Sequence, residues 1–270
     1  MGVIDLEGDR HVGMFRILTA AVIGLGLASG AAAAAEMTKI RIANEGAYPP
    51  FNFVNDQGKL DGFDVDITNA LCEKMQADCE LITQDWDGII PGLLANKYDA
   101  IISAMSITDE RKQSVDFSDK YALSAGQFVA PKDKTYDDVS PKALAGKVIA
   151  VQRSTTHVTF LEDNYKDSDI RLYDTQDQAN LDLAAGRADL TLADQPVLGD
   201  WLKTPDGQGY HFVAGPVADP KWYGEGIGVA VRKGNDDLVA KFNEAIAAIR
   251  ADGTFKTIND KWFNFDIYGE

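Results

Sequence analysis

The stretch DAIISAMSITDERKQSVDFSD, residues 99–119, decides the fold. It begins as a short apolar strand at 100–102, continues through small and hydroxyl-bearing residues at 103–106, and enters a polar helical turn that Thr108 is placed to cap. Small residues let a ligand approach the backbone at a strand end, where N–H groups and hydroxyls can bind it. Arg111 adds a planar charged group that suits a carboxylate. An arginine in a polar turn is more often a solvated surface residue, so this interpretation depends on what other strand ends offer.

Strands and helices alternate on both sides of this stretch. Strands are expected at 39–44, 80–83, 127–130, 147–151, 170–173, 188–192 and 226–231. Apolar residues recur at helical spacing between them, at 65–75, 86–94 with Asp87 as a cap, 158–161, a segment ending at 186, and 238–249. This order predicts mainly parallel sheets with helices on their faces. Because the pattern starts again near Ala125, we expect two α/β lobes, residues 36–123 plus 226–270 and residues 124–225, joined by two crossover hinge strands.

The first 35 residues have the layout of a secretory signal peptide. Arg16 precedes an apolar run of about a dozen residues and an alanine-rich tract with small residues before Glu36. Met14 is an alternative true start, because the acidic residues among the first 13 do not suit a charged n-region. The run is short for a membrane anchor, and no cysteine near the cut offers a lipid attachment site. We therefore expect an exported, periplasmic protein without a lipid anchor.

Charge and cysteine content agree with export. The formal net charge of −16 disfavours nucleic acid and anionic lipid as partners, and its ordinary meaning is solubility. Cys72 and Cys79 are the only cysteines and lie at an expected helix-to-strand junction. In an oxidising compartment they are expected to form a disulfide; the alternative is two reduced thiols in the core.

Four polar clusters lie just beyond the carboxyl ends of predicted parallel strands. They are Glu45 to Tyr48, Ser103 to Arg111, Gln152 to Thr156, and Asp194. Ligands of open α/β sheets bind at that end of the strands, and two clusters belong to each lobe, so a site in the cleft between the lobes is expected. The groups complement an α-amino acid. Arg111, with the Ser106 N–H, suits the carboxylate, a helix N-terminus at 154–156 adds backbone donors, and Asp194 suits the ammonium.

The remaining groups suit a cationic side chain. Glu45 offers a negative charge, and Tyr48 and Trp86 offer aromatic faces. Each group also has a plainer interpretation. Tyr48 and Trp86 can be core aromatics, Asp194 can cap a helix, and Glu45 can be a solvated loop acid.

Six segments carry a family resemblance. They are IRIANEGAYPPF (40–51), GKLDGFDVDITNALCEKM (58–75), WDGIIPGLLANKYDAIISAMSITDERKQSVDFSDKY (86–121), AVQRSTTHVTFL (150–161), GRADLTLAD (186–194) and ADGTFKTINDKWF (251–263). In this order the chain resembles the bacterial extracellular solute-binding proteins, family 3, which are polar-amino-acid-binding components of ABC importers. It looks most like the lysine/arginine/ornithine-, histidine- and opine-binding members, including their cysteine pair. The resemblance implies a two-lobed periplasmic-binding-protein fold of type II, with a mainly parallel sheet and flanking helices in each lobe.

The resemblance also implies roles for single residues. Arg111 looks like the carboxylate clamp with Ser106 and Thr156 as its partners, Asp194 like the ammonium acceptor, Tyr48 and Trp86 like the walls around the ligand side chain, and Glu45 like the acid of basic-ligand binders. Three positions depart from the family pattern: Ala104 replaces a common Ser, Gln152 replaces an apolar residue, and His157 replaces a Gln at the pocket rim. The expected ligand-binding set is Glu45, Tyr48, Trp86, Ser103, Ala104, Ser106, Arg111, Gln152, Thr155, Thr156 and Asp194.

The implied function is capture of a basic amino acid or opine and its delivery to an inner-membrane ABC permease. A monomer without cofactor, metal or catalytic residues is expected; His157 is not expected to bind a metal, because His211 is the only other histidine after the signal region. The alternatives are a glutamine- or histidine-type or broad-specificity binder, a chemosensory protein, and a lyase-like enzyme on the same fold. Against an enzyme, the motifs G-x-S-x-G, S-x-x-K, H-E-x-x-H and G-x-x-x-x-G-K-[ST] are absent from the sequence.

Overall fold

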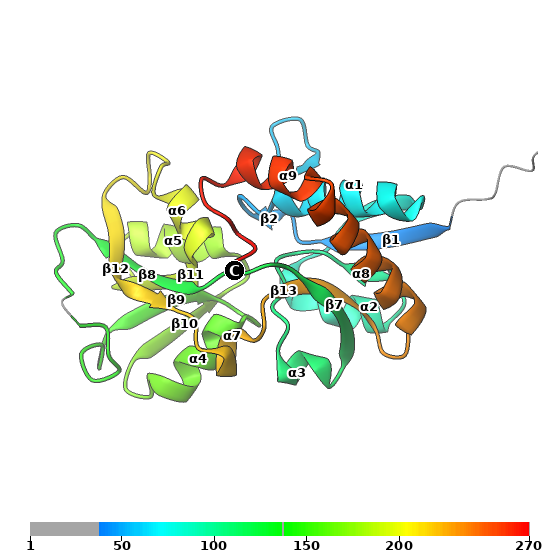
Figure 1. Ribbon diagram of the computed structural model, residues 1–270. Helices are drawn as coiled ribbons and strands as arrows, with labels where there is room; N and C mark the ends of the chain where they lie inside the picture. Colours follow the sequence, from blue (N-terminus) through cyan, green and yellow to red (C-terminus); the bar gives the residue numbers. More distant parts are fainter. Residues whose placement is uncertain (1–37, 137, 270) are drawn as a thin grey trace, which may run out of the picture. The chain divides into compact units, whose positions relative to one another are not determined.

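The computed structural model describes residues 38–136 and 138–269, and the predicted signal peptide lies outside these residues. Two five-stranded sheets carry the described chain (Figure 1). We call the chain around the first sheet lobe 1 and the chain around the second sheet lobe 2. The predicted limits of the lobes stay a prediction. Within the described ranges, no helix has the length and apolar character needed to cross a membrane.

The sheet of lobe 1 has the strand order β5-β1-β6-β13-β7. Its strands are β1 (Lys39–Asn44), β5 (Asp78–Thr83), β6 (Ala100–Ile101), β7 (Val115–Ala122) and β13 (Ile227–Arg232). Strand β13 is antiparallel to both neighbours, whereas β1 is parallel to β5 and to β6. A small antiparallel sheet is formed by β2 (Ala47–Tyr48), β3 (Asn52–Val54) and β4 (Leu60–Asp61). The helical elements of this lobe are α1 (Phe63–Met75), η1 (Trp86–Gly88), α2 (Ile89–Leu94), α3 (Asp109–Lys112), α8 (Asp236–Ala251) and α9 (Thr254–Trp262).

The sheet of lobe 2 repeats this plan with the order β10-β9-β11-β8-β12. Its strands are β8 (Gly126–Pro131), β9 (Val148–Gln152), β10 (Asp169–Tyr173), β11 (Leu190–Asp194) and β12 (Tyr210–Val217). In this sheet β8 is antiparallel to both of its neighbours, β11 and β12, whereas β9 is parallel to β10 and to β11. The helices are α4 (Thr156–Asn164), α5 (Gln176–Ala184), α6 (Gln195–Trp201) and α7 (Pro220–Tyr223).

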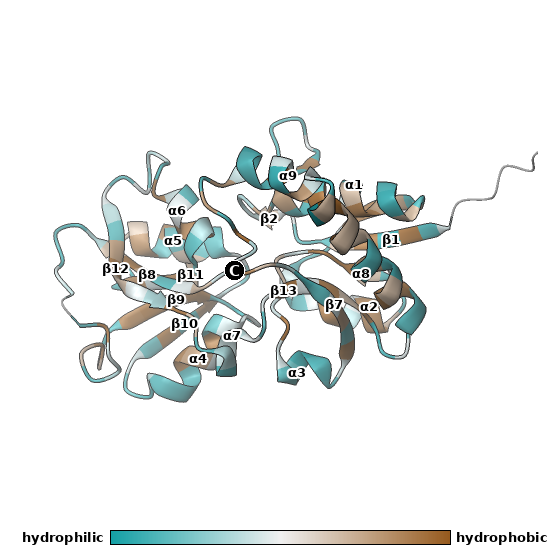
Figure 2. Cartoon of the chain, in the orientation of Figure 1, coloured by the Kyte–Doolittle hydropathy of each residue, from teal (hydrophilic) through white to brown (hydrophobic). Residues whose placement is uncertain are grey.

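Apolar cores lie on both faces of each sheet. In lobe 1, α1, α8 and α9 pack with Ile40 and Ile42 on one face, and Ile89 and Leu93 pack on the other. Figure 2 shows apolar residues along β7, β8 and β9, whereas the short helix α3 is hydrophilic. The chain passes between the sheets twice, between β7 and β8 and between β12 and β13. The expected fold class is confirmed: two sheets, mainly parallel, with helices on their faces.

The two expected caps have different outcomes. The prediction for Thr108 is confirmed, because its Oγ1 accepts a hydrogen bond from the Arg111 N–H at 3.2 Å. The prediction for Asp87 is wrong, since Asp87 lies inside the turn η1 and the residue before that turn is Asp85. The carboxylate of Asp87 instead accepts a hydrogen bond from the Ser154 hydroxyl of lobe 2.

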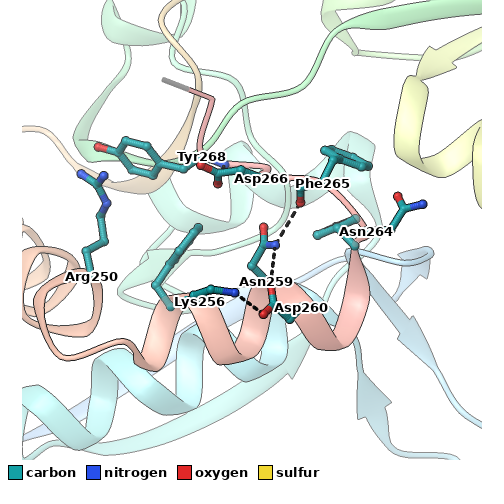
Figure 3. Close-up of a pocket in the computed structure, with 10 residues that line it drawn as sticks. Arg250, Lys256, Asn259, Asp260, Asn264, Phe265, Asp266 and Tyr268 are labelled. Atoms are coloured by element: carbon teal, nitrogen blue, oxygen red, sulfur yellow. Dashed lines mark hydrogen bonds and ion pairs between the residues drawn. The ribbon is translucent and has the colours of Figure 1, made fainter.

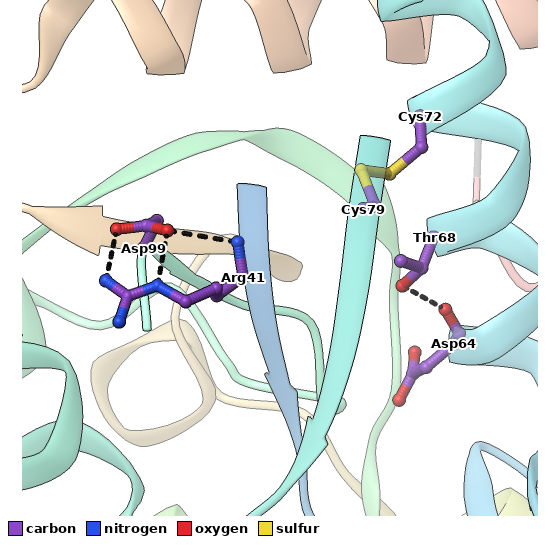
Figure 4. Close-up of a disulfide and its surroundings, with 6 residues drawn as sticks. All are labelled: Arg41, Asp64, Thr68, Cys72, Cys79 and Asp99. Carbon is purple, nitrogen blue, oxygen red and sulfur yellow. Dashed lines mark hydrogen bonds and ion pairs between the residues drawn. A yellow bond between two sulfur atoms is a disulfide. The ribbon is translucent and has the colours of Figure 1, made fainter. Parts of the chain in front are cut away.

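The predicted disulfide joins Cys72, near the end of α1, to Cys79 in β5 (Figure 4). The sulfur atoms are 2.07 Å apart, and among the described residues no cysteine is free. The bridge closes a short loop at the point where α1 turns into the edge strand of the sheet, so it ties this helix to the sheet that it covers.

Asp64 is a fully buried carboxylate in the first turn of α1 (Figure 4). It accepts hydrogen bonds from Tyr121 Oη and from Asn52 Nδ2, both at 2.8 Å. The Asn52 side chain in turn accepts a hydrogen bond from the Gly46 N–H at 2.8 Å. Burial raises the pKa of Asp64 to about 7, although both hydrogen bonds favour the charged form. Asp64 thus fixes the loop that carries Glu45 and Tyr48.

Replacing both cysteines by serine is expected to lower the free energy of unfolding by about 2 kcal/mol, because the unfolded chain gains the entropy of an open loop. Urea unfolding of the Cys72→Ser, Cys79→Ser double variant measures the loss. A thiol reductant should destabilise the wild-type protein similarly and leave the double variant unchanged; equal stability of oxidised wild type and variant would contradict this account.

The pKa of Asp64 makes stability depend on pH. Because it is raised above that of an unfolded aspartate, the native state takes up a proton at higher pH than the unfolded state does. Lowering the pH from about 7.5 to about 5 should therefore increase the free energy of unfolding, with about 2 kcal/mol from this group. Urea unfolding of Asp64→Asn should show a smaller increase. The control Asp56→Asn, in an exposed turn, should keep the full increase, and a full increase in Asp64→Asn would refute the assignment.

Candidate functional site

One pocket between the two sheets collects the predicted site residues around a space of only about 20 Å³. Its lining residues are Glu45, Tyr48, Trp86, Ser103, Ala104, Ser106, Arg111, Gln152, Thr155, Thr156, His157 and Asp194. The lining therefore contains every residue of the expected set and adds His157. The residues lie at or just after the ends of β1, β5, β6, β9 and β11, which is the strand-end placement that the sequence predicts.

Arg111 lies at one end of the pocket, on α3. Its Nη1 donates to the Ser106 carbonyl at 3.0 Å, and its guanidinium lies 5.3 Å from the centre of the Trp86 ring. Burial lowers the pKa of Arg111 to about 10. Among residues 38–136 and 138–269, no carboxylate forms an ion pair with this guanidinium, so its charge is available to an anion in the pocket.

The N-terminus of α4 faces the same pocket from lobe 2. Thr155 caps this nine-residue helix, since its Oγ1 accepts a hydrogen bond from the Val158 N–H at 3.4 Å. The same hydroxyl donates to the Gln152 carbonyl at 2.8 Å, which fixes the turn between β9 and α4. Thr156, at the start of the helix, therefore presents a hydroxyl and a backbone donor next to Arg111.

Asp194 is the last residue of β11 in lobe 2. Its Oδ2 accepts a hydrogen bond from Tyr48 Oη of lobe 1 at 2.6 Å and lies 3.4 Å from His157 Nε2. Burial alone would raise the pKa of Asp194, but the hydrogen bond and the charge interaction with His157, together with the hydrogen bond from Tyr48, outweigh it and hold the pKa below its ordinary value. Asp194 precedes α6, yet its side chain makes no capping hydrogen bond. Its carboxylate is thus a buried negative charge in the pocket.

Glu45 is the second carboxylate of the pocket and is only 5% exposed. Its Oε1 accepts a hydrogen bond from Gln152 Nε2 of lobe 2 at 2.6 Å, and its N–H donates to Ser103 Oγ at 2.9 Å. Burial raises the pKa of Glu45 to about 7, against the effect of the Gln152 hydrogen bond. In the described part of the chain it has no cationic partner, so a cation in the pocket would favour its charged form.

Tyr48 and Trp86 are both core aromatics and pocket walls. They are 6% and 8% exposed and belong to the apolar clusters on opposite faces of the first sheet. Each also reaches across the cleft, Tyr48 to Asp194 and Trp86 through a 3.1 Å hydrogen bond from Nε1 to the Ser154 carbonyl. Ala104 completes this wall with a positive φ of 45°, which turns the chain after β6 toward the pocket.

The structure corrects the expected position of His157. It does not lie at the pocket rim but is 2% exposed inside the pocket, between Asp194 and Tyr223. The reason is that the first turn of α4 faces the cleft and packs against α7. The sequence alone does not predict the contact between Ser154 and Asp87. The only sequence signal for it is that both residues lie in segments that carry the family resemblance.

A groove of about 630 Å³ lies beside α8, α9 and the segment after α9 (Figure 3). Several of its polar side chains pair with one another or with the backbone. Asn259 Nδ2 donates to the Phe265 carbonyl at 2.9 Å, and Lys256 pairs with Asp260. Nowhere in the described chain do three or more metal-binding side chains of the His, Cys, Asp and Glu types come together.

Comparison with known proteins gives one consistent result. A model of the bacterial extracellular solute-binding proteins, family 3, matches residues 40–265. An L-arginine-binding protein of Pseudomonas aeruginosa is 47% identical over 234 residues, which cover 85% of this chain and 90% of the relative. A solved periplasmic binding protein of Salmonella typhimurium, described for its high arginine specificity, matches with a TM-score of 0.78 at 32% identity. The match covers 84% of this chain and 100% of the other.

A second solved structure extends the comparison. An ancestral arginine-binding protein bound to arginine has a TM-score of 0.78 at 36% identity, with 84% of this chain and 98% of the other covered. The family match over residues 40–265 spans both sheets and all the pocket segments. The chain belongs to the bacterial extracellular solute-binding proteins, family 3, and has their two-lobed type II periplasmic-binding-protein fold.

Proposed function

We propose that this protein binds a basic amino acid of the arginine type between its lobes. One observation carries the proposal: the pocket is lined by one guanidinium, that of Arg111, and two carboxylates, those of Asp194 and Glu45. The complementary ligand has one carboxylate and two cationic groups. A basic amino acid has this set of charges and adds the net positive charge that the pocket lacks.

Each end of such a ligand has a matching site. The α-carboxylate meets the fork of Arg111 and the donors of Thr156, and the α-ammonium meets Asp194. The side chain then extends between Tyr48 and Trp86, whose faces suit an alkyl chain and a cation. Glu45 accepts the terminal guanidinium or ammonium, with Gln152 beside it as a further polar group.

The same charges rank the alternative ligands. An opine carries a second carboxylate, and of the described residues that line the pocket only Arg111 is a lysine or arginine. Glutamine has no second cation and would leave Glu45 buried without a partner. Both are therefore expected to bind more weakly than arginine. Three relatives or neighbours have arginine in their descriptions, which supports arginine as a ligand.

The cellular role follows from the family. We propose that the protein is a monomer that works in the periplasm, closes around its ligand and delivers it to the permease of an ABC importer. Contacts from both lobes to one ligand favour the closed state, and the permease then has a closed surface to bind. No catalytic step is proposed.

The experiment that tests the binding function is calorimetric titration of the purified protein with arginine, lysine, ornithine, glutamine and octopine. Arginine or another basic amino acid should bind most tightly, and the ligand recovered afterwards should be chemically unchanged. A strongest response to glutamine or octopine would overturn the proposed ligand class. Conversion of the ligand would favour an enzyme.

Arg111→Ala is expected to weaken arginine binding at least about a hundredfold, because the ligand carboxylate would lose its charged partner inside a closed cleft. Calorimetry gives the affinities. Arg171→Ala, on the exposed side of β10, is the matched control and should bind like the wild type. Near-native affinity of Arg111→Ala would rule out the clamp.

Glu45→Gln is expected to weaken binding of arginine and lysine about tenfold or more and to strengthen glutamine binding, since the cationic ligands lose a charged partner and glutamine no longer leaves a carboxylate unpaired. Competition titrations with both ligand types measure the difference. Lowering the pH below about 7 should weaken arginine binding in the same direction, because Glu45 has a pKa of about 7 without ligand. Equal losses for arginine and glutamine would count against the role of Glu45.

A further inference from the structure

His157 is a buried ionisable group in the pocket to which ligand binding as described above gives no role. Its Nε2 lies 3.4 Å from Asp194 Oδ2, and its Nδ1 lies 3.2 Å from Tyr223 Oη. Since Tyr48 Oη also donates to Asp194 Oδ2, four side chains form one buried polar chain in the order Tyr48, Asp194, His157, Tyr223. The chain reaches from β2 in lobe 1 to α7 beside the second crossing.

The neutral form of His157 fits these contacts with one proton on the ring. With that proton on Nε2, the ring donates to Asp194, and Nδ1 accepts the hydrogen of the Tyr223 hydroxyl. A protonated ring would place a full positive charge 3.4 Å from the carboxylate that the ligand ammonium is proposed to use.

We propose that His157 is a positioning residue for Asp194 that makes capture of the ligand ammonium depend on pH. When His157 is neutral, it orients Asp194 and leaves the negative charge to the ligand. When it is protonated, the imidazolium and the ligand ammonium compete for one carboxylate, so affinity falls as the pH falls. This inference rests on the proposed binding of a basic amino acid.

Other ionisable groups around His157 come from each neighbouring element. They are Asp194 in β11, Tyr223 on α7, Tyr48 on β2, and Arg111, Glu45 and Asp64 on the lobe 1 side. Glu45, whose pKa burial raises to about 7, weakens arginine binding in the same direction when it takes up a proton. The test must therefore separate the two groups, and their positions allow it. Glu45 acts on the ligand side chain, whereas His157 acts on the α-ammonium.

The test compares arginine with its desamino analogue, which lacks only the α-ammonium. Dissociation constants are measured by calorimetry between about pH 8 and about pH 5.5, where histidines titrate. For the wild-type protein the loss of affinity toward low pH should be about tenfold larger for arginine than for the analogue. An equal loss for both ligands would overturn the inference, because Glu45 alone would then explain it.

The variant His157→Gln supplies the second arm. Gln keeps a donor toward Asp194 but carries no titratable charge. In this variant, affinity for arginine should therefore fall toward low pH no more steeply than affinity for the desamino analogue does. His211→Gln, in β12 and outside the pocket lining, is the matched control and should keep the wild-type profile. A wild-type profile in His157→Gln would also overturn the inference. Failure of arginine to bind the wild type at pH 8 would instead refute the proposed function, and if His157→Gln does not fold, the two-ligand comparison on the wild type still decides.

Discussion

A charge that leaves water requires an opposite charge or hydrogen bonds, and this constraint governs the pocket. Closure buries Arg111, Asp194 and Glu45 together. Asp194 receives hydrogen bonds from Tyr48 and His157, so its pKa stays low. Arg111 and Glu45 have no ionic partner among the described residues, and burial shifts the pKa of each toward the neutral form. Closure without ligand is therefore unfavourable for these two groups. A ligand that brings both missing charges removes the penalty, which is the differential interaction that a population shift needs.

The topology places these groups on opposite sides of one cleft. In each sheet, strands of one direction end at the same edge, and the pocket side chains lie at or just after the ends of β1, β5, β6, β9 and β11. The lone antiparallel strands, β8 and β13, are the first strands after the two crossings between the sheets. Each lobe thus keeps a rigid parallel core, and only two short connections join them. The buried Asp64 network then fixes the loop of Glu45 and Tyr48 on the lobe 1 side, so the lobe 1 half of the site has its shape before the ligand arrives.

Much of the fold and the site could be predicted because the signals are local. Apolar strands such as 39–44, the cap at Thr108 and the polar strand ends are visible in the sequence alone. Strand β7 was missed because its burial alternates irregularly and it pairs only with β13, more than a hundred residues later. The position of His157 depends on its packing against Tyr223, and the contact of Asp87 with Ser154 depends on how the lobes meet. Such long-range contacts leave no periodic pattern in either partner.

Specificity in this pocket arises as much from what a wrong ligand leaves unpaired as from what the right one binds. A ligand with a neutral side chain leaves the Glu45 carboxylate without a cationic partner. This carboxylate must then either stay charged in a buried site or take up a proton. Because the pKa of Glu45 is about 7, protonation is the less costly of the two near neutral pH. In the proposed complex, rejection of a neutral ligand by Glu45 is therefore stronger in alkaline than in acidic surroundings. Asp194 differs, because its contacts with His157 and Tyr48 lower its pKa instead of raising it. On this proposal the α-ammonium of the ligand meets a carboxylate that contacts within the protein favour in its charged form, whereas the side chain of the ligand meets a carboxylate whose charge the ligand itself restores.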